Sequence, residues 1–206
     1  AGAVATRVLG PKVVTKIGMV GTGVQARYQL QYLRYVTDCR HVMIYGRSNE
    51  NVMTLKMDLE KMGWVVEVAK APNDLMNHCN VIVTTTCARQ GLLSELPTIH
   101  PTLLVCIGAD APGKQELAAE LVAHADCLVC DSRIQTKERG EFQHALQSGL
   151  VSMSSSSVLE LGEVVANSSL LANGRSLTIF DSSGVAFQDC IVAKIVYETL
   201  NDISIE

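Results

Sequence analysis

Short apolar runs alternate with amphipathic segments along most of the chain. The apolar, β-branched runs expected to form strands cover residues 17–20, 41–45, 64–68, 81–86, 103–107 and 127–129. A helix is expected from residue 24 to about residue 35, and a second helix follows in which Val52, Leu55 and Leu59 recur at helical spacing. Strands that alternate with helices in this way predict a mostly parallel, doubly wound α/β sheet that is covered on both faces.

The last third of the chain departs from this alternation. A serine-rich loop over residues 152–157 is expected to lead into a short helix over residues 159–165. Residues 177–180 then form an extra C-terminal strand, and a closing helix from residue 185 to about residue 200 should turn Ile191, Ile195 and Leu200 toward a core. No internal repeat or convincing linker divides the chain, so we expect one domain over residues 1–206.

The composition limits the classes of partner. Hydrophobic residues make up 48% of the chain, which is enough to bury a core, and the formal net charge of -4 gives no broad basic surface for nucleic acid. No apolar run approaches the roughly 20 residues that span a bilayer, and the first residues lack the features of a signal peptide. We therefore expect no nucleic-acid partner and no membrane partner. The chain begins without Met inside what is expected to be a small-residue helix, which suggests a piece of a longer protein.

Seven cysteines lie mostly inside apolar runs. An odd number in such positions predicts reduced thiols and a cytoplasmic location. His124, Cys127 and Cys130 have the spacing H-x-x-C-x-x-C, which can bind zinc. Strand geometry would place residues three apart on opposite faces, so we expect buried core cysteines here and no metal site.

The turn after the first expected strand carries a nucleotide-binding signal. Residues 21–26 read Gly-Thr-Gly-Val-Gln-Ala, the spacing G-x-G-x-x-A, between a buried strand and a helix N-terminus. Gly21 permits the tight turn, Gly23 lets the backbone approach a pyrophosphate, and Ala26 lets the helix close onto the strand. Free N–H groups at the helix N-terminus would hold the phosphates. The glycines alone would equally fit a structural turn, but their context favours a dinucleotide site.

The end of the second strand bears on the choice of cofactor. In a doubly wound sheet, ligands bind beyond the carboxyl ends of the strands, and an NAD site would hold Asp or Glu there for the ribose hydroxyl. This chain has Gly46, followed by Arg47 and Ser48. A guanidinium and a hydroxyl suit a 2′-phosphate, so NADP is preferred over NAD. Arg47 could instead be a solvated loop residue that stacks on an adenine.

A carboxylate and an amine follow the fifth strand. Asp110 and Lys114 stand four residues apart around a Pro-Gly turn at the same edge of the sheet. Asp110 could move a proton to or from a substrate amine or imine, and Lys114 could contact a phosphate or hold the charge of Asp110. Asp110 could equally cap a helix that starts near Pro112, and the spacing alone leaves both readings open.

Four motifs occur in a fixed order along the chain. They are Ile-Gly-Met-Val-Gly-Thr-Gly-Val-Gln-Ala at 17–26, Gly-Ala-Asp-Ala-Pro-Gly-Lys-Gln-Glu-Leu at 108–117, Leu-Gly-Glu-Val at 161–164 and Phe-Asp-Ser-Ser-Gly-Val-Ala-Phe-Gln-Asp at 180–189. Together they resemble the ornithine cyclodeaminase/μ-crystallin family over nearly the whole chain, and the second motif is the most specific. The resemblance implies the NAD(P)-binding Rossmann domain of that family.

The resemblance also implies roles for individual residues. Asp110 resembles the catalytic carboxylate of the cyclodeaminase and alanine dehydrogenase branches, a proton donor and acceptor beside the substrate nitrogen. In the μ-crystallin branch the residue at this position is not acidic, so Asp110 favours an enzyme. Lys114 resembles a cofactor contact, and Ser183 sits where the tail loop of the family meets substrate and nicotinamide. The implied cofactor-binding positions are Gly21, Thr22, Gly23, Val24, Gln25, Gly46, Arg47, Ser48, Thr86, Ile107, Lys114 and Ser183.

The implied function is an NAD(P)-dependent oxidoreductase that acts on the C–N bond of an amino or cyclic imino acid, as an imine reductase or amino-acid dehydrogenase. NAD-dependent cyclodeaminases of the family carry Asp where Gly46 stands, which disfavours ornithine cyclodeamination. A cyclodeaminase-type ammonia lyase that recycles bound NAD, and a non-catalytic NADPH-binding protein like μ-crystallin, are the alternatives. The family's substrate and dimerisation domain would precede Ala1. We therefore expect a homodimer in the full-length protein and no activity of this chain by itself.

Overall fold

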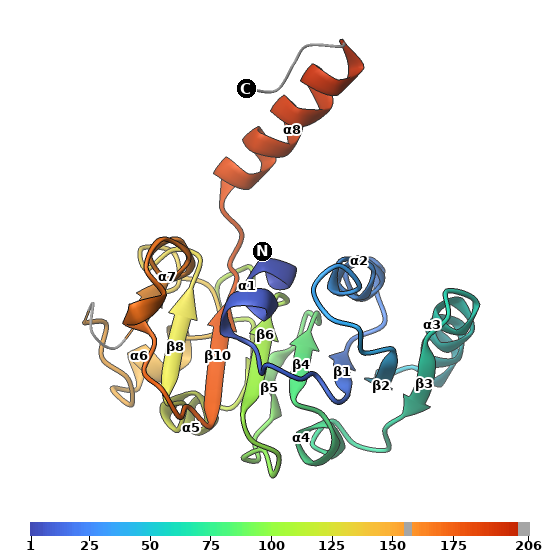
Figure 1. Ribbon diagram of the computed structural model, residues 1–206. Coiled ribbons are helices and arrows are strands. Elements are labelled where there is room, and N and C mark those ends of the chain that lie inside the picture. Colours follow the sequence, from blue (N-terminus) through green and yellow to red (C-terminus); the bar gives the residue numbers. More distant parts are fainter. Residues whose placement is uncertain (155–157, 202–206) are drawn as a thin grey trace.

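An eight-stranded, fully parallel sheet forms the centre of the computed structural model, which describes residues 1–154 and 158–201 (Figure 1). Its strands are β1 (Ile17–Val20), β2 (His41–Tyr45), β3 (Val65–Val68), β4 (Val81–Thr84), β6 (Thr102–Cys106), β8 (Cys127–Cys130), β9 (Val158–Glu160) and β10 (Leu177–Asp181). They lie side by side in the order β3-β2-β1-β4-β6-β10-β8-β9. The predicted doubly wound α/β fold is thus confirmed.

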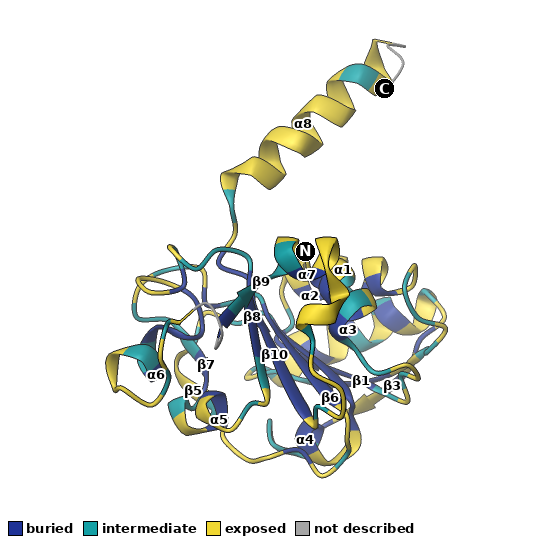
Figure 2. Ribbon diagram, turned by 60° about the vertical axis from the view of Figure 1, so that its left-hand side comes forward, coloured by how far each residue is buried: buried dark blue, intermediate teal, exposed yellow. Residues whose placement is uncertain are grey.

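Both faces of the sheet are covered. One face carries α1 (Gly2–Leu9), α2 (Val24–Leu33), α3 (Asn49–Lys61) and α7 (Leu161–Ala166). The other carries α4 (Asp74–His78), α5 (Ala119–Ala123), α6 (Gln143–Gln147) and a separate two-stranded sheet of β5 (Arg89–Leu93) and β7 (Gln115–Leu117). Each face has its own buried cluster, in which Leu30 and Leu55 pack on the first side and Leu75 and Phe142 on the second (Figure 2).

The last strand enters the middle of the sheet. β10 pairs with β6 and with β8, so that Phe180 lies opposite Val105 on one side and Val129 on the other. Because all strands run the same way, their carboxyl ends form one edge, here called the carboxyl edge, and their starts form the amino edge. The sequence predicts the extra strand but not its insertion between two earlier strands.

The closing helix α8 (Ala186–Leu200) differs from its prediction. We expected Ile191, Ile195 and Leu200 to face a core, but α8 projects from the body and none of its residues is buried (Figures 1 and 2). Leu200 is 79% exposed. The periodicity identifies the helix correctly, but its apolar side chains are covered by nothing in the described structure. No helix among the described residues, α8 included, has the length and apolarity to cross a membrane.

Smaller differences concern the polar segments. Residues 158–160 form β9, so the helix expected from residue 159 begins only at Leu161 as α7. The pair β5 and β7 and the short helices α5 and α6 were not predicted, because their sequences lack a clear apolar period. Part of the expected serine-rich loop, residues 155–157, lies outside the described residues. A 3₁₀ turn, η1 (Ser168–Leu170), comes before β10.

Candidate cofactor site

The turn between β1 and α2 lies at the carboxyl edge. Gly21 has a φ of +114°, and a Cβ placed there would lie 2.5 Å from Thr85 Oγ1. A side chain is therefore excluded both by the backbone conformation and by the close approach of the next loop. Gly21 N also donates to Tyr45 O at 2.8 Å, which fixes this turn between the ends of β2 and β4.

The N-terminus of α2 is open. Gly23 stands before the helix with extended backbone, no side chain caps the first turn, and no described atom lies within 4 Å of a Cβ placed on Gly23. Val24 and Gln25 are exposed. Helical N–H groups without a side-chain cap, together with the helix dipole, attract phosphate groups. Residues 21–25, here called the glycine turn, thus fit the pyrophosphate of a dinucleotide.

Arg27 supports the glycine turn from the body of α2. Its Nη1 donates to Thr22 O at 2.9 Å, and its Nη2 pairs with Asp58 Oδ2 of α3 at 2.7 Å. Ala26 is fully buried, as expected for a helix that closes onto the sheet. Sequence reasoning did not single out Arg27, because its partner on α3 is far away along the chain.

The end of β2 has no room for a carboxylate. A Cβ on Gly46 would lie 2.5 Å from Thr22 Cγ2 and 2.9 Å from Val52 Cγ2. Ser48 caps α3, since its Oγ accepts from Asn51 N at 3.4 Å. Arg47 is exposed and makes no hydrogen bond or ion pair with the described residues. Its guanidinium is therefore available to a ligand phosphate.

Asp110 and Lys114 form an ion pair on the loop after β6. Lys114 Nζ donates to Asp110 Oδ1, and the Asp110 side chain remains 58% exposed. Gly113 takes a φ of +73° in the turn between them, and strand β7 follows, so no helix begins near Pro112 for Asp110 to cap. Asp110 is thus an exposed carboxylate at the carboxyl edge.

One buried carboxylate joins the loops after β4 and β6. Glu116 Oε2 accepts from Thr84 Oγ1 at 2.6 Å and from Gly108 N at 2.9 Å, while Oε1 accepts from Thr86 N at 2.5 Å. Burial raises the pKa of Glu116, although its hydrogen bonds act in the opposite direction. Ile107 N donates to Thr84 O at 2.9 Å. The predicted cofactor contacts Thr86 and Ile107 therefore lie on loops that Glu116 ties together.

Two further buried acids continue this series. Glu141 accepts from the backbone N–H groups of Glu116 at 3.0 Å and Leu117 at 2.6 Å, and its own N donates to Asp181 Oδ1 at 2.9 Å. Thr136 Oγ1 donates to the other oxygen of Asp181. Burial raises the pKa of Asp181 to about 7 and places that of Glu141 well above its ordinary value. Glu116 and Asp181 lie within the motifs at 108–117 and 180–189, but sequence reasoning gave neither of them a role, and it missed Glu141 altogether.

A fourth acid holds the turn after β10. Asp131 accepts from Ser183 Oγ at 2.9 Å and from Gly184 N at 2.7 Å, and Ser182 Oγ reaches it at 3.2 Å. Ser183 Oγ also lies 3.2 Å from Gln135 Oε1. Ser183 is only 4% exposed, and its contact with substrate or nicotinamide stays a prediction.

Contacts between neighbouring loops bring the predicted positions to one edge. The glycine turn meets the end of β2, where Thr22 lies against Gly46, and it meets the loop after β4 at Thr85. That loop meets the loop after β6, because a Cβ on Gly108 would lie 2.2 Å from Thr86 O. Next to the loop after β6 in space lies the end of β10, where Ser182 N donates to Cys106 O at 2.9 Å.

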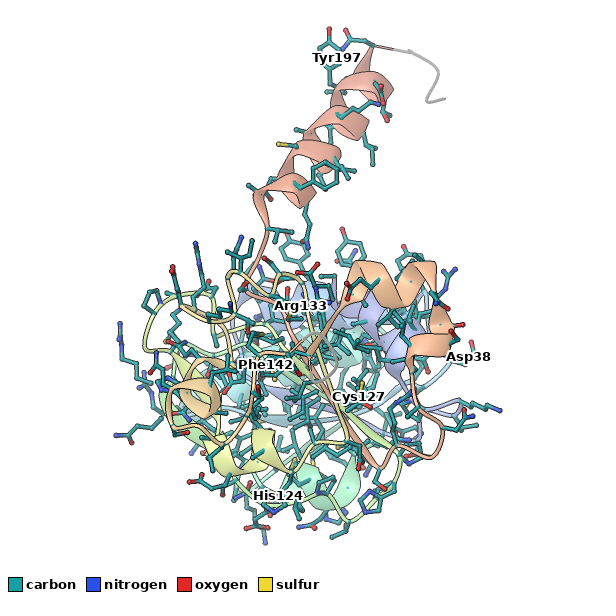
Figure 3. The ribbon with its side chains drawn as sticks, turned by 90° about the vertical axis from the view of Figure 1, so that its left-hand side faces the viewer. Asp38, His124, Cys127, Arg133, Phe142 and Tyr197 are labelled. Carbon is teal, nitrogen blue, oxygen red and sulfur yellow. The ribbon has the colours of Figure 1, made fainter. Side chains whose placement is uncertain are left out.

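The cysteine pattern runs along β8 from the amino edge to the carboxyl edge. Cys127 and Cys130 are the first and last residues of β8, which confirms the predicted strand, and both are free thiols whose pKa burial raises. His124 precedes β8 near the amino edge, at the end of the body opposite α8, whereas Arg133 lies toward α8 (Figure 3). No group of residues suited to hold a metal ion occurs in the described ranges.

The sequence matches the model of the ornithine cyclodeaminase/mu-crystallin family over residues 1–204. The chain belongs to this family. The resemblance inferred from the four motifs is therefore confirmed, and the Rossmann architecture described above is that of the family's solved structures.

Curated members of the ornithine cyclodeaminase/mu-crystallin family include enzymes of two kinds that are similar to this chain. An alanine dehydrogenase of Archaeoglobus fulgidus is 35% identical over 202 residues, which cover 96% of this chain and 61% of that protein. An iminosuccinate reductase of Paracoccus denitrificans is 33% identical over 198 residues, which cover 96% of this chain and 61% of that protein.

Solved structures of the family superpose closely. An archaeal alanine dehydrogenase dimer with bound NAD has a TM-score of 0.87 at 33% identity, covering 100% of this chain and 63% of its own. The Δ1-pyrroline-2-carboxylate reductase of Thermococcus litoralis, in complex with NADH and L-proline, has a TM-score of 0.88 at 25% identity, covering 97% and 62%. A lysine cyclodeaminase has a TM-score of 0.82 at 26% identity, covering 99% and 58%. The chain thus spans about three fifths of the length of the relatives it matches.

Proposed function

We propose that this chain is the dinucleotide-binding part of an oxidoreductase that acts on the C–N bond of an amino acid or a cyclic imino acid. The observation that carries the proposal is Asp110, an exposed carboxylate on the same edge of the sheet as the open N-terminus of α2. An acid in such a place can exchange a proton with a substrate nitrogen. The similarity to a dehydrogenase and to two reductases of this reaction class supports the same assignment.

The cofactor of this proposal is NAD or NADP, with NADP preferred. The glycine turn would bind the pyrophosphate through backbone N–H groups, and Arg47 would lie beside the 2′-phosphate. The neighbours that contain NAD or NADH support a nicotinamide dinucleotide, while the preference for NADP rests on Gly46 and Arg47 alone. The remaining contacts are assigned to Ser48, Thr86, Ile107, Lys114 and Ser183.

When bound, the nicotinamide supplies or accepts the hydride at the substrate carbon. In reduction, Asp110 would first take a proton from solvent, give it to the substrate nitrogen and return to the carboxylate that pairs with Lys114; in the reverse direction that carboxylate would take the proton. Lys114 donates to Oδ1 of Asp110, which leaves Oδ2 without a partner among the described residues. Oδ2 is therefore the oxygen we assign to the substrate nitrogen.

We also propose that a further domain, outside this chain, completes the substrate site and the homodimer. The relatives extend well beyond the matched region, and the alanine dehydrogenase structure is a dimer. α8 exposes apolar side chains around its circumference, among them Phe187, Ile191 and Val196, and a helix of this kind is normally buried. The further domain would cover α8 and supply the cationic groups for the substrate carboxylate. This chain by itself would then bind the cofactor without turnover.

The test is a turnover assay on the full-length protein. Cyclic imino acids, and 2-oxo acids with ammonia, are each mixed with NADPH or NADH, and the absorbance of the reduced cofactor is followed. We expect stoichiometric oxidation of the cofactor with at least one substrate, and faster oxidation of NADPH.

Two other outcomes would replace the proposal. Release of ammonia from ornithine or lysine without net cofactor turnover would identify a lyase, the class to which the similar lysine cyclodeaminase belongs. Tight cofactor binding with no reaction across the panel would identify a binding protein.

A further inference from the structure

Asp110 and Lys114 contact each other and make no other side-chain hydrogen bond or ion pair within the described structure. Their position relative to the glycine turn is therefore set by the backbone that carries them. That backbone is the segment of residues 108–116, here called loop 108–116. Two buried side chains make most of the contacts that hold it: Glu116 joins its ends, and Gln143 binds its turn.

Glu116 closes the ends of loop 108–116. Its Oε2 accepts from Gly108 N at 2.9 Å, so the last residue of the loop binds the first. The same carboxylate binds Thr84 Oγ1 and Thr86 N of the neighbouring loop. Gly108 is also pressed against Thr86, where no side chain could be accommodated. The base of the loop is thereby fixed to the end of β4.

Gln143 holds the turn of loop 108–116. Its Oε1 accepts from Gly113 N at 2.9 Å, and its Nε2 donates to Lys114 O at 3.2 Å and to Gly140 O at 2.8 Å. Gln143 is 2% exposed; its bond to Gly140 O is buried, and its two bonds to the loop are partly buried. His144 Nε2 also lies 3.2 Å from Lys114 O. The backbone between Asp110 and Lys114 is thus attached to the protein through the carboxamide of Gln143 and, at the Lys114 carbonyl, also through the imidazole of His144.

We propose that Glu116 and Gln143 are positioning residues that fix the Asp110–Lys114 pair for the proton transfer. The inference rests on the proposed function, because it assigns the pair its role. An exposed ion pair by itself restrains geometry weakly, since water and entropy oppose it. Proton transfer needs the acid within hydrogen-bond reach of the substrate nitrogen, and a displacement of about 1 Å can reduce turnover on the order of 100-fold.

The primary test compares Gln143→Ala with Asn80→Ala in the full-length protein. Asn80 is a matched control at the amino edge, because its buried carboxamide accepts from Thr15 N at 2.9 Å and donates to Val13 O at 2.9 Å. Both variants should lose comparable thermal stability. Gln143→Ala alone should lower kcat, on the order of 10- to 100-fold, with little change in the dissociation constant of NADPH.

Amide hydrogen exchange of the protein without cofactor supplies an independent readout. Gln143→Ala should speed exchange in residues 108–114, whereas Asn80→Ala should speed exchange only near residues 13–15. Glu116→Gln is the second variant if Gln143→Ala does not fold. Its amide group would turn N–H toward the N–H of Thr86 or Gly108, so one of these amides should exchange faster and kcat should fall.

Equal kcat values for Gln143→Ala and Asn80→Ala would overturn the inference, as would unchanged exchange in loop 108–116 for both positioning variants. If the wild-type protein turns over no amino or imino acid, the proposed function fails instead. In that case the exchange of residues 108–114 still decides whether Gln143 and Glu116 position the pair.

Discussion

The two edges of the sheet hold their loops by different means. At the amino edge, the neutral side chain of Asn80 and the exposed carboxylate of Asp126 bind backbone groups of the loops. At the carboxyl edge, the same task falls to the buried acids Glu116, Glu141 and Asp181, and at the turn after β10 to the partly buried Asp131. Burying a carboxylate is costly unless hydrogen bonds compensate for the lost water. The loops at the carboxyl edge are thus held by groups whose burial costs more free energy.

The pKa values reflect this contrast. The N–H groups of Leu177 and Ser176 lower the pKa of Asp126, whereas burial raises that of Asp181 to about 7. An acid with a lowered pKa stabilises the fold when ionised, and one with a raised pKa opposes ionisation in the folded state. We interpret the difference as a sign that loop positions at the carboxyl edge serve a ligand, since perturbed acids cluster at functional sites.

The amino edge also has a cavity that could hold a ligand. A cavity of about 970 Å³ is lined by residues 6–14, 36–39, 100–102 and 172–176, all near the amino edge. This volume is within the usual range of small-molecule sites. The glycine turn and the open N-terminus of α2, however, lie at the carboxyl edge and not at this cavity. The carboxyl edge is therefore preferred as the dinucleotide site because of its groups suited to phosphate, and not because of the volume of a cavity.

The largest expected effect is the loss of the acid. Asp110→Asn in the full-length protein should lower turnover on the order of 100-fold or more, because the amide cannot exchange the proton. Asp126→Asn, at the amino edge, should leave turnover within the range of the wild type. Initial rates of NADPH oxidation with the best substrate measure both. A fully active Asp110→Asn protein would remove the catalytic role of Asp110.

Replacing a glycine by alanine should affect stability and NADPH affinity differently at the two edges. Gly21→Ala combines a positive φ with a clash against Thr85, and should cost on the order of 2–3 kcal/mol of stability and reduce NADPH affinity about tenfold or more. Gly174→Ala has a φ of +73° but no atom within 4 Å of the added Cβ, and should cost only about 1 kcal/mol. Thermal unfolding and calorimetric titration test this, and equal NADPH affinities would count against the glycine turn.

The acids of the two edges predict opposite responses to pH. Because the folded-state pKa of Asp181 is raised to about 7, its contribution to stability is full below about pH 4 and is lost as the pH rises to 7. Asp126 has a lowered pKa and behaves in reverse, since its contribution is lost as the pH falls. Asp181→Asn should therefore flatten the decline in unfolding free energy between pH 5 and 7 by about 1–2 kcal/mol, as measured by urea titration. An unchanged slope would contradict the raised pKa.

The smallest expected effect concerns the 2′-phosphate. Arg47→Ala should weaken NADPH about tenfold and leave NADH unchanged, because a charge-assisted contact to phosphate contributes about 1.4 kcal/mol. Arg7→Ala is the matched control, since Arg7 is also exposed without a bonding partner among the described residues but lines the cavity at the amino edge. Calorimetric titration of each variant with NADPH shows at which edge the cofactor binds. A greater loss of NADPH affinity with Arg7→Ala would favour the amino edge.

Most of the sheet could be predicted because its strands are short, apolar and buried on both faces. The run 41–45 agrees with β2 residue for residue, and the ends of β1 and β2 place the glycine turn and Gly46 at one edge. The position of β10 could not be predicted, because the pattern of a strand carries no information about its neighbours. The helix α8 was recognised, but its degree of burial was not, since none of the described residues covers its apolar side chains.

The candidate site divides in the same way. The glycine turn could be predicted because its backbone demands are local, as the positive φ of Gly21 illustrates. The buried acids could not, because Glu116 binds a residue 32 positions away and Asp181 one 45 positions away. Local sequence therefore predicts the residues suited to contact a ligand, and the three-dimensional fold is needed to find the residues that hold them in place.

The central claim is that the carboxyl edge binds a nicotinamide dinucleotide, and a crystal structure of this chain with NADPH tests it most directly. The account predicts the pyrophosphate against the backbone N–H groups of residues 22–25, with Arg47 beside the 2′-phosphate. An empty glycine turn at saturating NADPH, or a cofactor in the cavity at the amino edge, would contradict it.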